Sequence, residues 1–271
     1  MKVSVIIPTY KPQDYIWECL ASLTKQTFSY NLFEVIIVLN GCCEPWKSEL
    51  EAYIRDNMSA LNVQLVQIDQ GGVSNARNVA IDMAKGEYVT FLDDDDYISP
   101  RYLELLYEKA DENSVVLSRP FAFNDGCPTK SVPYPMMDVY EEMHCSTNIS
   151  IASKVRKYFS GPCMKLIPMS FVQGKRYDVR FRNGEDSLFM FLISDRIESI
   201  NFADRESVYY RRYRIGSAVT TKRSRVEVIK NGLLLICMYC KYFFKTPFAY
   251  NWLFFFTRIM ATFKQIIINC L

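Results

Sequence analysis

The chain has 271 residues, of which 49% are hydrophobic and 23% charged, close to the average for globular proteins. This composition excludes a wholly disordered or collagen-like chain and allows one large domain, with or without an appendage. The net charge of +2 conceals an asymmetry, because residues 1–204 carry 20 basic and 28 acidic side chains whereas residues 205–271 carry 12 and 2. A basic segment after an acidic body suggests an anionic partner for that segment.

The first 120 residues alternate strand and helix patterns at short spacing, which is typical of a mostly parallel sheet flanked by helices. Apolar, β-branched runs predict buried strands, and runs with helical periodicity predict the helices between them. The predicted strands are 3–7, 34–39, 63–68, 88–92 and 115–118; the predicted helices start after Asp14, lie around 50–54, and span 74–84 and 100–113. The sequence therefore predicts an α/β fold.

The stretch 119–150 is rich in Pro, Asp and Asn and has no clear period, which predicts a long loop. Helix and strand patterns return from 152 to 213, and the basic segment then predicts two helices broken at Thr246 and Pro247. The longest run without charge in that segment, 246–257, has 12 residues, and a membrane span needs about 20. We expect the segment to lie on a membrane rather than to cross it.

Nine cysteines raise the question of a disulfide framework, but the number is odd and no signal peptide precedes the first strand. We therefore expect a reducing cytoplasm. Cys237 and Cys240 form a C-x-x-C pair that lacks the second Cys or His pair of a zinc site, since His144 is the single histidine. We interpret both cysteines as small apolar residues on a helix.

Four aspartates, Asp93 to Asp96, follow the predicted strand 88–92 directly. Ligands of open parallel sheets bind at the carboxyl ends of the strands. Adjacent carboxylates repel one another unless a cation or proton compensates, and oxygen ligands favour Mg²⁺ or Mn²⁺, which also bind substrate phosphates. The alternative is a solvated acidic turn at the start of the next helix.

A glycine pair, Gly71 and Gly72, precedes a helix whose N-terminus and Arg77 suit a phosphate. The segment lacks the G-x-G-x-x-G spacing of a dinucleotide site and the Gly-Lys-Ser/Thr of a P-loop. A nicotinamide or ATP enzyme is therefore not expected.

Several motifs occur in the order and spacing of family 2 glycosyltransferases, namely VSVIIPTY (3–10), EVIIV (34–38), GVSNARN (72–78) and GEYVTFLDDDD (86–96). The chain resembles this family over residues 1–217. The resemblance implies the GT-A nucleotide-sugar fold, with a nucleotide-sugar-binding half (1–118), an acceptor and catalytic half (119–217), and a basic amphipathic helical tail (218–271).

The resemblance also implies roles for individual residues. Asp186, in the GED motif at 184–186, is the expected catalytic base, and Asp95 is expected on a Mn²⁺ or Mg²⁺ ion that bridges the donor diphosphate. Glu185 and Lys165 are expected at the acceptor. The expected donor-binding residues are Pro8, Thr9, Tyr10, Asn40, Arg77, Asp93, Asp94, Arg214 and Ser217.

Two of these segments also fit a purely structural role, without any contact to a substrate. Glu185 and Asp186 also suit the first turn of a helix, where the helix dipole favours carboxylates. The arginines at 211–214 also suit an exposed basic strand, because crowded arginines often merely solvate a surface.

One position departs from the family pattern. Many relatives have an Asp after the second strand that hydrogen-bonds the base, whereas this chain has Leu39 followed by Asn40. The Asn40 amide offers both an acceptor and a donor, so we expect it to take over base recognition. UDP is the commonest nucleotide of the family.

The resemblance implies an inverting, in-line transfer of a hexose or N-acetylhexosamine from a UDP-sugar to a hydroxyl of a saccharide acceptor, with a β-glycosidic product. A lipid-linked (diphosphoundecaprenol) acceptor in O-antigen, lipopolysaccharide or capsule assembly, at the inner face of the cell membrane, is the family-level expectation. The alternative is a catalytically impaired glycan- or membrane-binding scaffold. Nucleic acid is not an expected partner, because the acidic body opposes a polyanion.

Polar residues recur at helical spacing in the last predicted helix, at Asn251, Arg258, Thr262, Gln265 and Asn269. They leave a broad apolar surface, the pattern of an interfacial helix: Trp252, Phe254, Phe255, Phe256, Ile259, Phe263 and Ile266. Each Lys or Arg near an anionic membrane contributes about 1 kcal/mol, so a few would recruit the chain. The alternative is that this surface packs on the body or on a second subunit.

Overall fold

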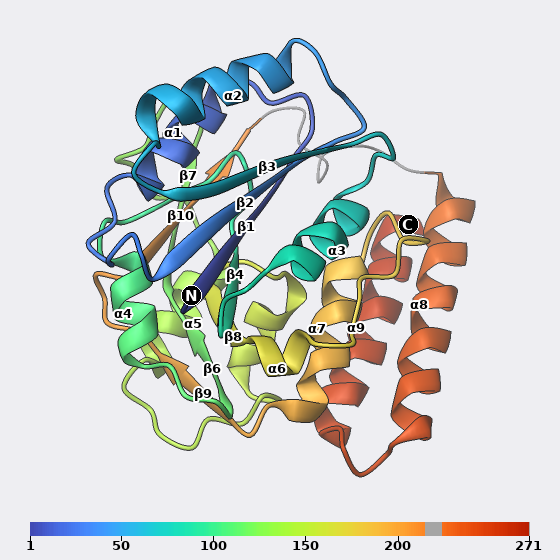
Figure 1. Ribbon diagram of the computed structural model, residues 1–271. Coiled ribbons are helices and arrows are strands. Elements are labelled where there is room, and N and C mark those ends of the chain that lie inside the picture. The colour runs from blue at the N-terminus through green and yellow to red at the C-terminus, as the bar shows by residue number, and fades with distance from the viewer. Residues whose placement is uncertain (215–223, 271) are drawn as a thin grey trace.

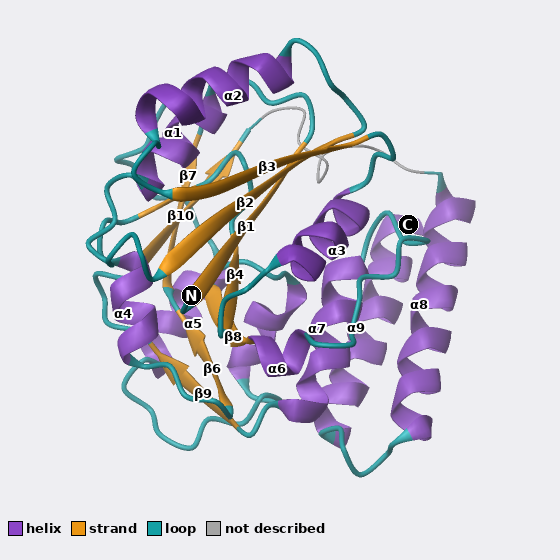
Figure 2. Cartoon of the chain, in the orientation of Figure 1, coloured by secondary structure: helices purple, strands orange, loops and turns teal. Residues whose placement is uncertain are grey.

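The predicted parallel strands form one side of a seven-stranded sheet with the order β3-β2-β1-β4-β8-β6-β9. The computed structural model describes residues 1–214 and 224–270. Figures 1 and 2 show α1 and α2 along one side of this sheet, with α3 on the other. Every residue of β1 and β2 is buried, because both faces of these central strands are covered.

The strands are β1 (Val3–Thr9), β2 (Phe33–Asn40), β3 (Asn62–Ile68), β4 (Tyr88–Phe91), β5 (Tyr97–Ile98), β6 (Ser114–Leu117), β7 (Arg119–Asn124), β8 (Lys165–Pro168), β9 (Ser199–Phe202) and β10 (Val208–Tyr213). The α-helices are α1 (Tyr15–Leu23), α2 (Trp46–Asn57), α3 (Val73–Met83), α4 (Tyr102–Glu108), α5 (Pro135–Met143), α6 (Met169–Val172), α7 (Glu185–Ile193), α8 (Arg225–Lys245) and α9 (Trp252–Cys270). The 3₁₀-helices are η1 (Lys154–Ser160) and η2 (Ser194–Arg196).

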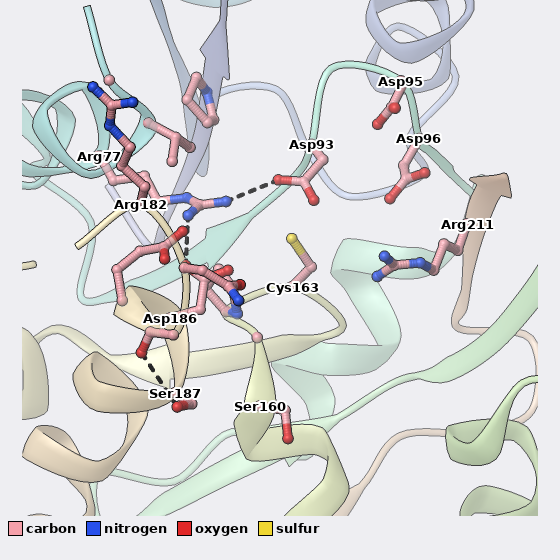
Figure 3. Close-up of a pocket in the computed structure, with 18 of the residues that line it drawn as sticks. Arg77, Asp93, Asp95, Asp96, Ser160, Cys163, Arg182, Asp186, Ser187 and Arg211 are labelled. Carbon is pink, nitrogen blue, oxygen red and sulfur yellow. Dashed lines mark hydrogen bonds and ion pairs between the residues drawn. The ribbon is translucent and has the colours of Figure 1, made fainter. Parts of the chain in front are cut away.

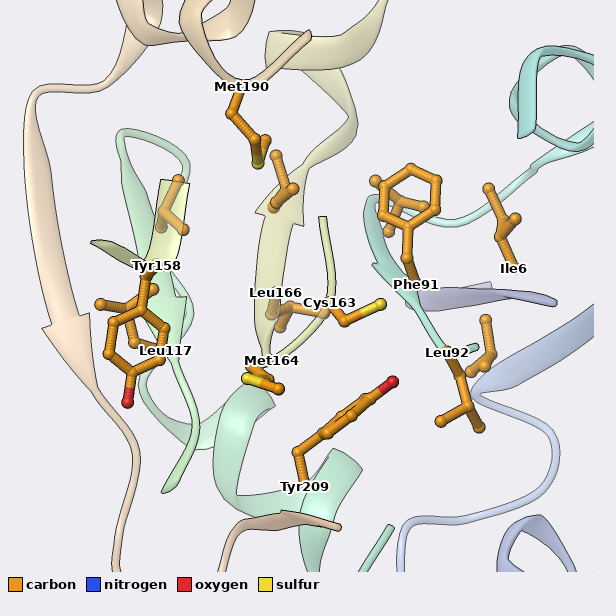
Figure 4. Packing of buried hydrophobic residues seen from close by; sticks show 14 of the residues in the cluster. Ile6, Phe91, Leu92, Leu117, Tyr158, Cys163, Met164, Leu166, Met190 and Tyr209 are labelled. Atoms are coloured by element: carbon orange, nitrogen blue, oxygen red, sulfur yellow. The ribbon is translucent and has the colours of Figure 1, made fainter. Parts of the chain in front are cut away.

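The first four strands are parallel, with Val3 paired to Phe33 and to Tyr88. β8 is antiparallel to both β4 and β6, and it joins this half to the second half of the chain. Figure 4 shows the core where the two halves meet, with Phe91 and Leu92 of the first half near Cys163, Leu166 and Met190 of the second. The predicted α/β class is confirmed.

A second sheet has the order β5-β10-β7 and brings three distant segments beside the aspartate run. β10 pairs in parallel with β7 and antiparallel with β5. The predicted loop over 119–150 is wrong in part, because it contains β7 and the helix α5. Local periodicity did not predict β7 since its pairing partner β10 lies far along the chain.

The tail forms two helices side by side, α8 and α9, with the break near Pro247 that the sequence predicts (Figure 1). They pack on α7 through aromatic rings: Phe191 stacks on Tyr250 with centroids 4.7 Å apart and also contacts Tyr239, Phe254 and Phe255. One face of the tail is therefore part of the body's core. Within residues 1–214 and 224–270, no helix combines the length and apolarity needed to cross a bilayer.

The cysteines of the described residues up to Cys240 are all free thiols. Cys237 is exposed and Cys240 half-buried on α8. Among the described residues no group of three or more His, Cys, Asp or Glu side chains has the arrangement of a metal cage.

Candidate active site

The carboxyl ends of β1, β2 and β4 open onto a cleft of about 2420 Å³. This is the edge of the sheet at which open α/β folds bind ligands. The sequence-predicted residues that line the cleft are Pro8, Thr9, Tyr10, Asn40, Arg77, Asp93, Asp94, Asp95, Glu185, Asp186 and Arg214. Ser217 lies outside the described residues, and Lys165 does not line the cleft.

The floor at the end of β1 is held by hydrogen bonds between loops. Thr9 Oγ1 donates to Asp94 Oδ2 at 2.5 Å, and burial raises the pKa of Asp94 to about 7 although this hydrogen bond opposes the shift. Tyr10, one residue further along, is 53% exposed. The floor thus combines an exposed aromatic ring with a fixed polar pair.

Asn40 ties two loops together. Its Nδ2 donates to Thr9 O at 2.7 Å and its Oδ1 accepts from Gly72 N at 2.9 Å, and the residue is only 4% exposed. Asn40 lines the cleft and its amide keeps a second N–H and a second lone pair, so its contact with the base stays a prediction. Beside it, Gly41 has φ +66°, and a Cβ there would lie 2.8 Å from Gly71 Cα, so only glycine fits.

Arg77 bridges two carboxylates at the centre of the cleft (Figure 3). Its Nη1 donates to Asp186 Oδ1 at 2.6 Å and its Nη2 to Asp93 Oδ1 at 3.0 Å. The side chain of Arg77 is 4% exposed, whereas those of Asp93 and Asp186 are 35% and 27% exposed. Arg77 was expected at a phosphate, but the structure instead pairs it with the two carboxylates that face the cleft.

Asp186 lies in the first turn of α7, which begins after Gly184 at φ +84°. Burial raises the pKa of Asp186, and the Arg77 guanidinium acts against that shift. A carboxylate with a raised pKa that still faces a cleft can accept a proton from a hydroxyl placed beside it. The first-turn position is thus compatible with both interpretations of the GED motif.

The last two aspartates of the run have different surroundings. Asp95 Oδ2 accepts from Arg214 Nε at 2.6 Å and its side chain is 18% exposed, on the cleft. Asp96 is buried and accepts from Tyr209 OH and from the Arg212 backbone N–H, both at 2.8 Å. Asp96 therefore joins the aspartate loop to β10, a structural role that the sequence did not reveal.

The arginines of β10 are not an exposed basic strand. The side chain of Arg212 is 9% exposed and pairs with Asp125 at 2.7 Å and with Glu18. Arg211 lines the cleft, with its guanidinium 5.4 Å from the Tyr134 ring centroid. Arg214 lies 4.6 Å from the Tyr15 ring centroid. These contacts fix the strand beside the aspartates.

Lys165 is fully buried, so its expected place at the acceptor is corrected. Its ammonium donates to Tyr158 O at 2.9 Å, Gly161 O at 2.7 Å and Cys163 O at 2.6 Å. Burial lowers the pKa of Lys165 to about 7, but three carbonyl acceptors require three N–H donors, which only the ammonium supplies. Lys165 shapes the turn before β8 rather than the cleft surface.

The far end of the cleft is walled by the tail, which the sequence did not predict. α8 contributes Asn231 and Tyr239, and α9 contributes Arg258, Thr262, Gln265 and Asn269. The α9 residues belong to the polar stripe that the helical spacing had already identified. That spacing located the stripe without showing what it faces.

Comparison with known proteins gives consistent matches. The sequence model of "Glycosyl transferase family 2" matches residues 4–172. The poly(ribitol-phosphate) β-N-acetylglucosaminyltransferase TarS of Staphylococcus aureus is 40% identical over 104 residues, which cover 38% of this chain and 18% of TarS. Glycosyltransferase GlyA of Streptococcus pneumoniae is 28% identical, over 80% of this chain and 31% of GlyA. The chain thus aligns with a third or less of the length of these curated relatives.

Solved structures extend the match to the fold. The crystal structure of S. aureus TarS residues 1–349 in complex with UDP-GlcNAc has a TM-score of 0.71 at 26% identity, covering 88% of this chain and 66% of that one. The mannosyltransferase PcManGT from Pyrobaculum calidifontis, in complex with GDP-Man and Mn²⁺, has a TM-score of 0.61 over 99% of this chain and 73% of that one. At 17% identity, this second match shows the fold alone.

Proposed function

The chain belongs to glycosyltransferase family 2, and we propose that its cleft transfers a hexose or N-acetylhexosamine from a UDP-sugar to a hydroxyl of a saccharide acceptor. The observation that carries the proposal is the convergence of Asp93, Asp95 and Asp186 on one cleft at the carboxyl ends of the strands. UDP is favoured because two of the TarS structures that align with 88% of this chain are complexes, one with UDP-GlcNAc and one with UDP.

The acceptor hydroxyl is a poor nucleophile, so a base must take its proton as the new bond forms at the anomeric carbon. We assign that role to Asp186, with Glu185 beside it toward the acceptor. Arg77 holds the Asp186 carboxylate in place at 2.6 Å and opposes the rise in its pKa that burial causes. Attack opposite the leaving diphosphate inverts the anomeric centre, so an α-linked donor yields a β-glycoside.

A divalent cation fits the aspartate run if one carboxylate and the substrate phosphates hold it together. The described residues form no cage of three or more acidic, His or Cys side chains, but Asp95 presents a carboxylate to the cleft. Mg²⁺ and Mn²⁺ sites of this kind use one or two carboxylates together with substrate phosphates. We propose that Asp95 holds the ion and that, when bound, the ion neutralises charge on the leaving diphosphate.

Other donor contacts follow from the same geometry. We propose that Tyr10 and the Pro8–Thr9 backbone face the base, that Asp93 and Asp94 lie at the ribose and sugar, and that Arg214 reaches the diphosphate. Arg214 is 2.6 Å from Asp95, so its cation lies where a metal-bound diphosphate would place negative charge. Ser217 completes the proposed donor set.

The tail supports a proposal of peripheral membrane binding. We define the outer apolar face as exposed aromatic and aliphatic residues of the two helices and of the turn between them, Phe244, Phe248, Trp252, Phe256, Met260, Phe263 and Ile267. Exposed lysines accompany it at positions 230, 241, 245 and 264. Four lysines contribute roughly 4 kcal/mol at an anionic surface. We therefore propose that the outer apolar face binds an anionic lipid bilayer.

Membrane contact is consistent with a lipid-linked acceptor. We propose that the enzyme works at the inner face of the cell membrane on a diphosphoundecaprenol-linked saccharide in bacterial surface-polysaccharide assembly. O-antigen, lipopolysaccharide and capsule units belong to this class. We also propose that the catalytic domain ends at residue 217 and that the tail after it both lines the cleft and binds the bilayer.

The test is a donor screen with purified protein, Mn²⁺ or Mg²⁺, a panel of UDP- and GDP-sugars, and a diphosphate-lipid saccharide as acceptor. We expect metal-dependent release of UDP from at least one UDP-sugar. Asp95→Asn should lower that rate roughly 10²- to 10³-fold and abolish its response to added metal. No transfer from any donor would favour the impaired scaffold instead.

A further inference from the structure

The cleft is larger than a nucleotide sugar requires. Pockets for ligands of comparable size usually occupy about 300–1,000 Å³, whereas this cleft encloses about 2420 Å³. More than half of it therefore remains after the donor is placed at the strand ends. The residues that line the cleft beyond Asp186 include side chains of α8 and α9.

The tail lines this far end with polar side chains, which lie beside Val228, Leu235, Ala261 and Ile266. We define the polar wall as the amide and hydroxyl side chains of α8 and α9 that line it there, Asn231, Tyr239, Thr262, Gln265 and Asn269. On α9 the spacing of 262, 265 and 269 puts these residues on one helix face. Trp252, Phe256, Met260, Phe263 and Ile267 lie on the opposite face and are exposed. α9 thus turns its polar side inward and its apolar side outward.

Packing holds the polar wall against the catalytic segment. A Cβ on Gly184 would lie 2.8 Å from Leu235 Cδ2, and a Cβ on Gly232 would lie 2.5 Å from Ile266 Cδ1. Asn231 Nδ2 donates to Asn183 O at 2.9 Å, and Ser187 Oγ lies 2.5 Å from Tyr239 OH. The wall is therefore fixed within a few residues of Asp186, where the acceptor hydroxyl must arrive.

The charges that line this end are of both signs. Arg182, Arg225 and Arg258 lie there together with Glu185 and Glu227. Arg258 is buried and donates to Ser160 Oγ at 3.3 Å and to Arg156 O. Amides and hydroxyls offer both donors and acceptors, which matches the hydroxyls of a neutral sugar.

We propose that the polar wall of α8 and α9 is the acceptor subsite and that it binds a neutral, hydroxyl-rich glycosyl unit. This rests on the proposed function, since it takes Asp186 as the base. In this assignment the tail has two ligands on opposite sides: the sugar inside the cleft and the bilayer outside it.

The test compares two threonines of α9. Thr262 and Thr257 each donate a side-chain hydrogen bond within the helix, to Arg258 O at 2.9 Å and to Phe254 O at 2.7 Å, but only Thr262 lines the cleft. Thr262→Val and Gln265→Leu remove polar groups from the wall, and Thr257→Val is the matched control. Saturation-transfer NMR measures binding of methyl β-glucoside, methyl β-galactoside, methyl N-acetyl-β-glucosaminide and, as an anionic comparison, glycerol phosphate to the full chain, with and without UDP and Mn²⁺.

We expect at least one glycoside to bind the wild type and Thr257→Val equally, and to bind Thr262→Val and Gln265→Leu roughly three- to tenfold more weakly. Equal binding to all four proteins, no glycoside binding, or stronger binding of glycerol phosphate than of any glycoside would overturn the proposal. UDP affinity is measured separately on the same samples. If the wild type does not bind UDP, the proposed donor is wrong. The glycoside comparison would still test whether the polar wall is the acceptor subsite.

Discussion

The two ends of the cleft are built on different principles. The donor end lies on strand termini and holds its shape through ion pairs, with Arg77 between Asp93 and Asp186 and Arg214 on Asp95. The far end lies on the tail helices and presents amides and hydroxyls. In the function proposed above, charge serves the diphosphate and the proton transfer, whereas neutral hydrogen-bonding groups serve the remaining substrate.

The largest effect is expected where the two ends meet. Asp186→Asn removes the proposed base, so turnover should fall roughly 10²- to 10⁴-fold while UDP affinity stays within about twofold. Turnover is measured as UDP release and affinity by calorimetry. Asp178→Asn is the control, since Asp178 also pairs with an arginine, Arg180, but does not line the cleft. Unchanged turnover in Asp186→Asn would show that Asp186 is not the catalytic base.

Arg77→Met tests whether charge pairing organises the donor end. Breaking the pairs should lower the free energy of unfolding by about 2–4 kcal/mol, toward the lower part of the range for buried pairs because both carboxylates are partly exposed. It also removes the cation that opposes the raised pKa of Asp186, so that pKa should rise further. The acidic limb of the turnover profile should therefore move to higher pH. A limb that stays in place would show that Arg77 does not act on the base.

Leu235→Ala tests whether the tail supports the catalytic segment. Leu235 is buried against Gly184, so its truncation should lower the free energy of unfolding by about 2–5 kcal/mol and reduce turnover more than UDP affinity. Denaturant unfolding and the UDP-release assay measure the two effects. Leu233→Ala, at an exposed site on the same helix, should change neither. Equal losses of turnover and UDP affinity would mean that a change in the tail disturbs the donor end of the cleft as much as the catalytic segment.

The smallest effect on chemistry is expected from the outer apolar face. Trp252→Ser with Phe256→Ser should reduce co-sedimentation with vesicles containing phosphatidylglycerol about tenfold or more, because two exposed aromatic rings are lost. Turnover on a water-soluble acceptor should not change. Val179→Ser, an exposed apolar site outside the tail, is the control.

The outcome of the vesicle experiment separates two occupants of the outer apolar face. Unchanged vesicle binding together with a change of oligomeric state would make this face a contact between copies of the chain. Point substitutions are preferred to removal of the tail, because deletion would expose Phe191, which packs on Tyr250, Phe254 and Phe255.

The sequence alone predicted the parallel strands and the aspartate run at the end of one of them. These are local patterns: strands buried on both faces are continuously apolar, and their carboxyl ends must meet at one edge. The resemblance of the motifs to the family predicts a site at the same edge of the sheet. β7 was missed because its partner β10 lies some 90 residues away along the chain, which leaves no local signal.

Only the tertiary structure decided which charges are already paired and which way the tail faces. Arg77 and Lys165 both suited a substrate contact by residue type, yet one bridges two carboxylates and the other caps three carbonyls. The polar stripe of α9 was visible in the sequence, but periodicity gives the faces of a helix and not their neighbours. Because the body buries the side of the tail next to α7, the stripe lines the cleft and the opposite face is left outside.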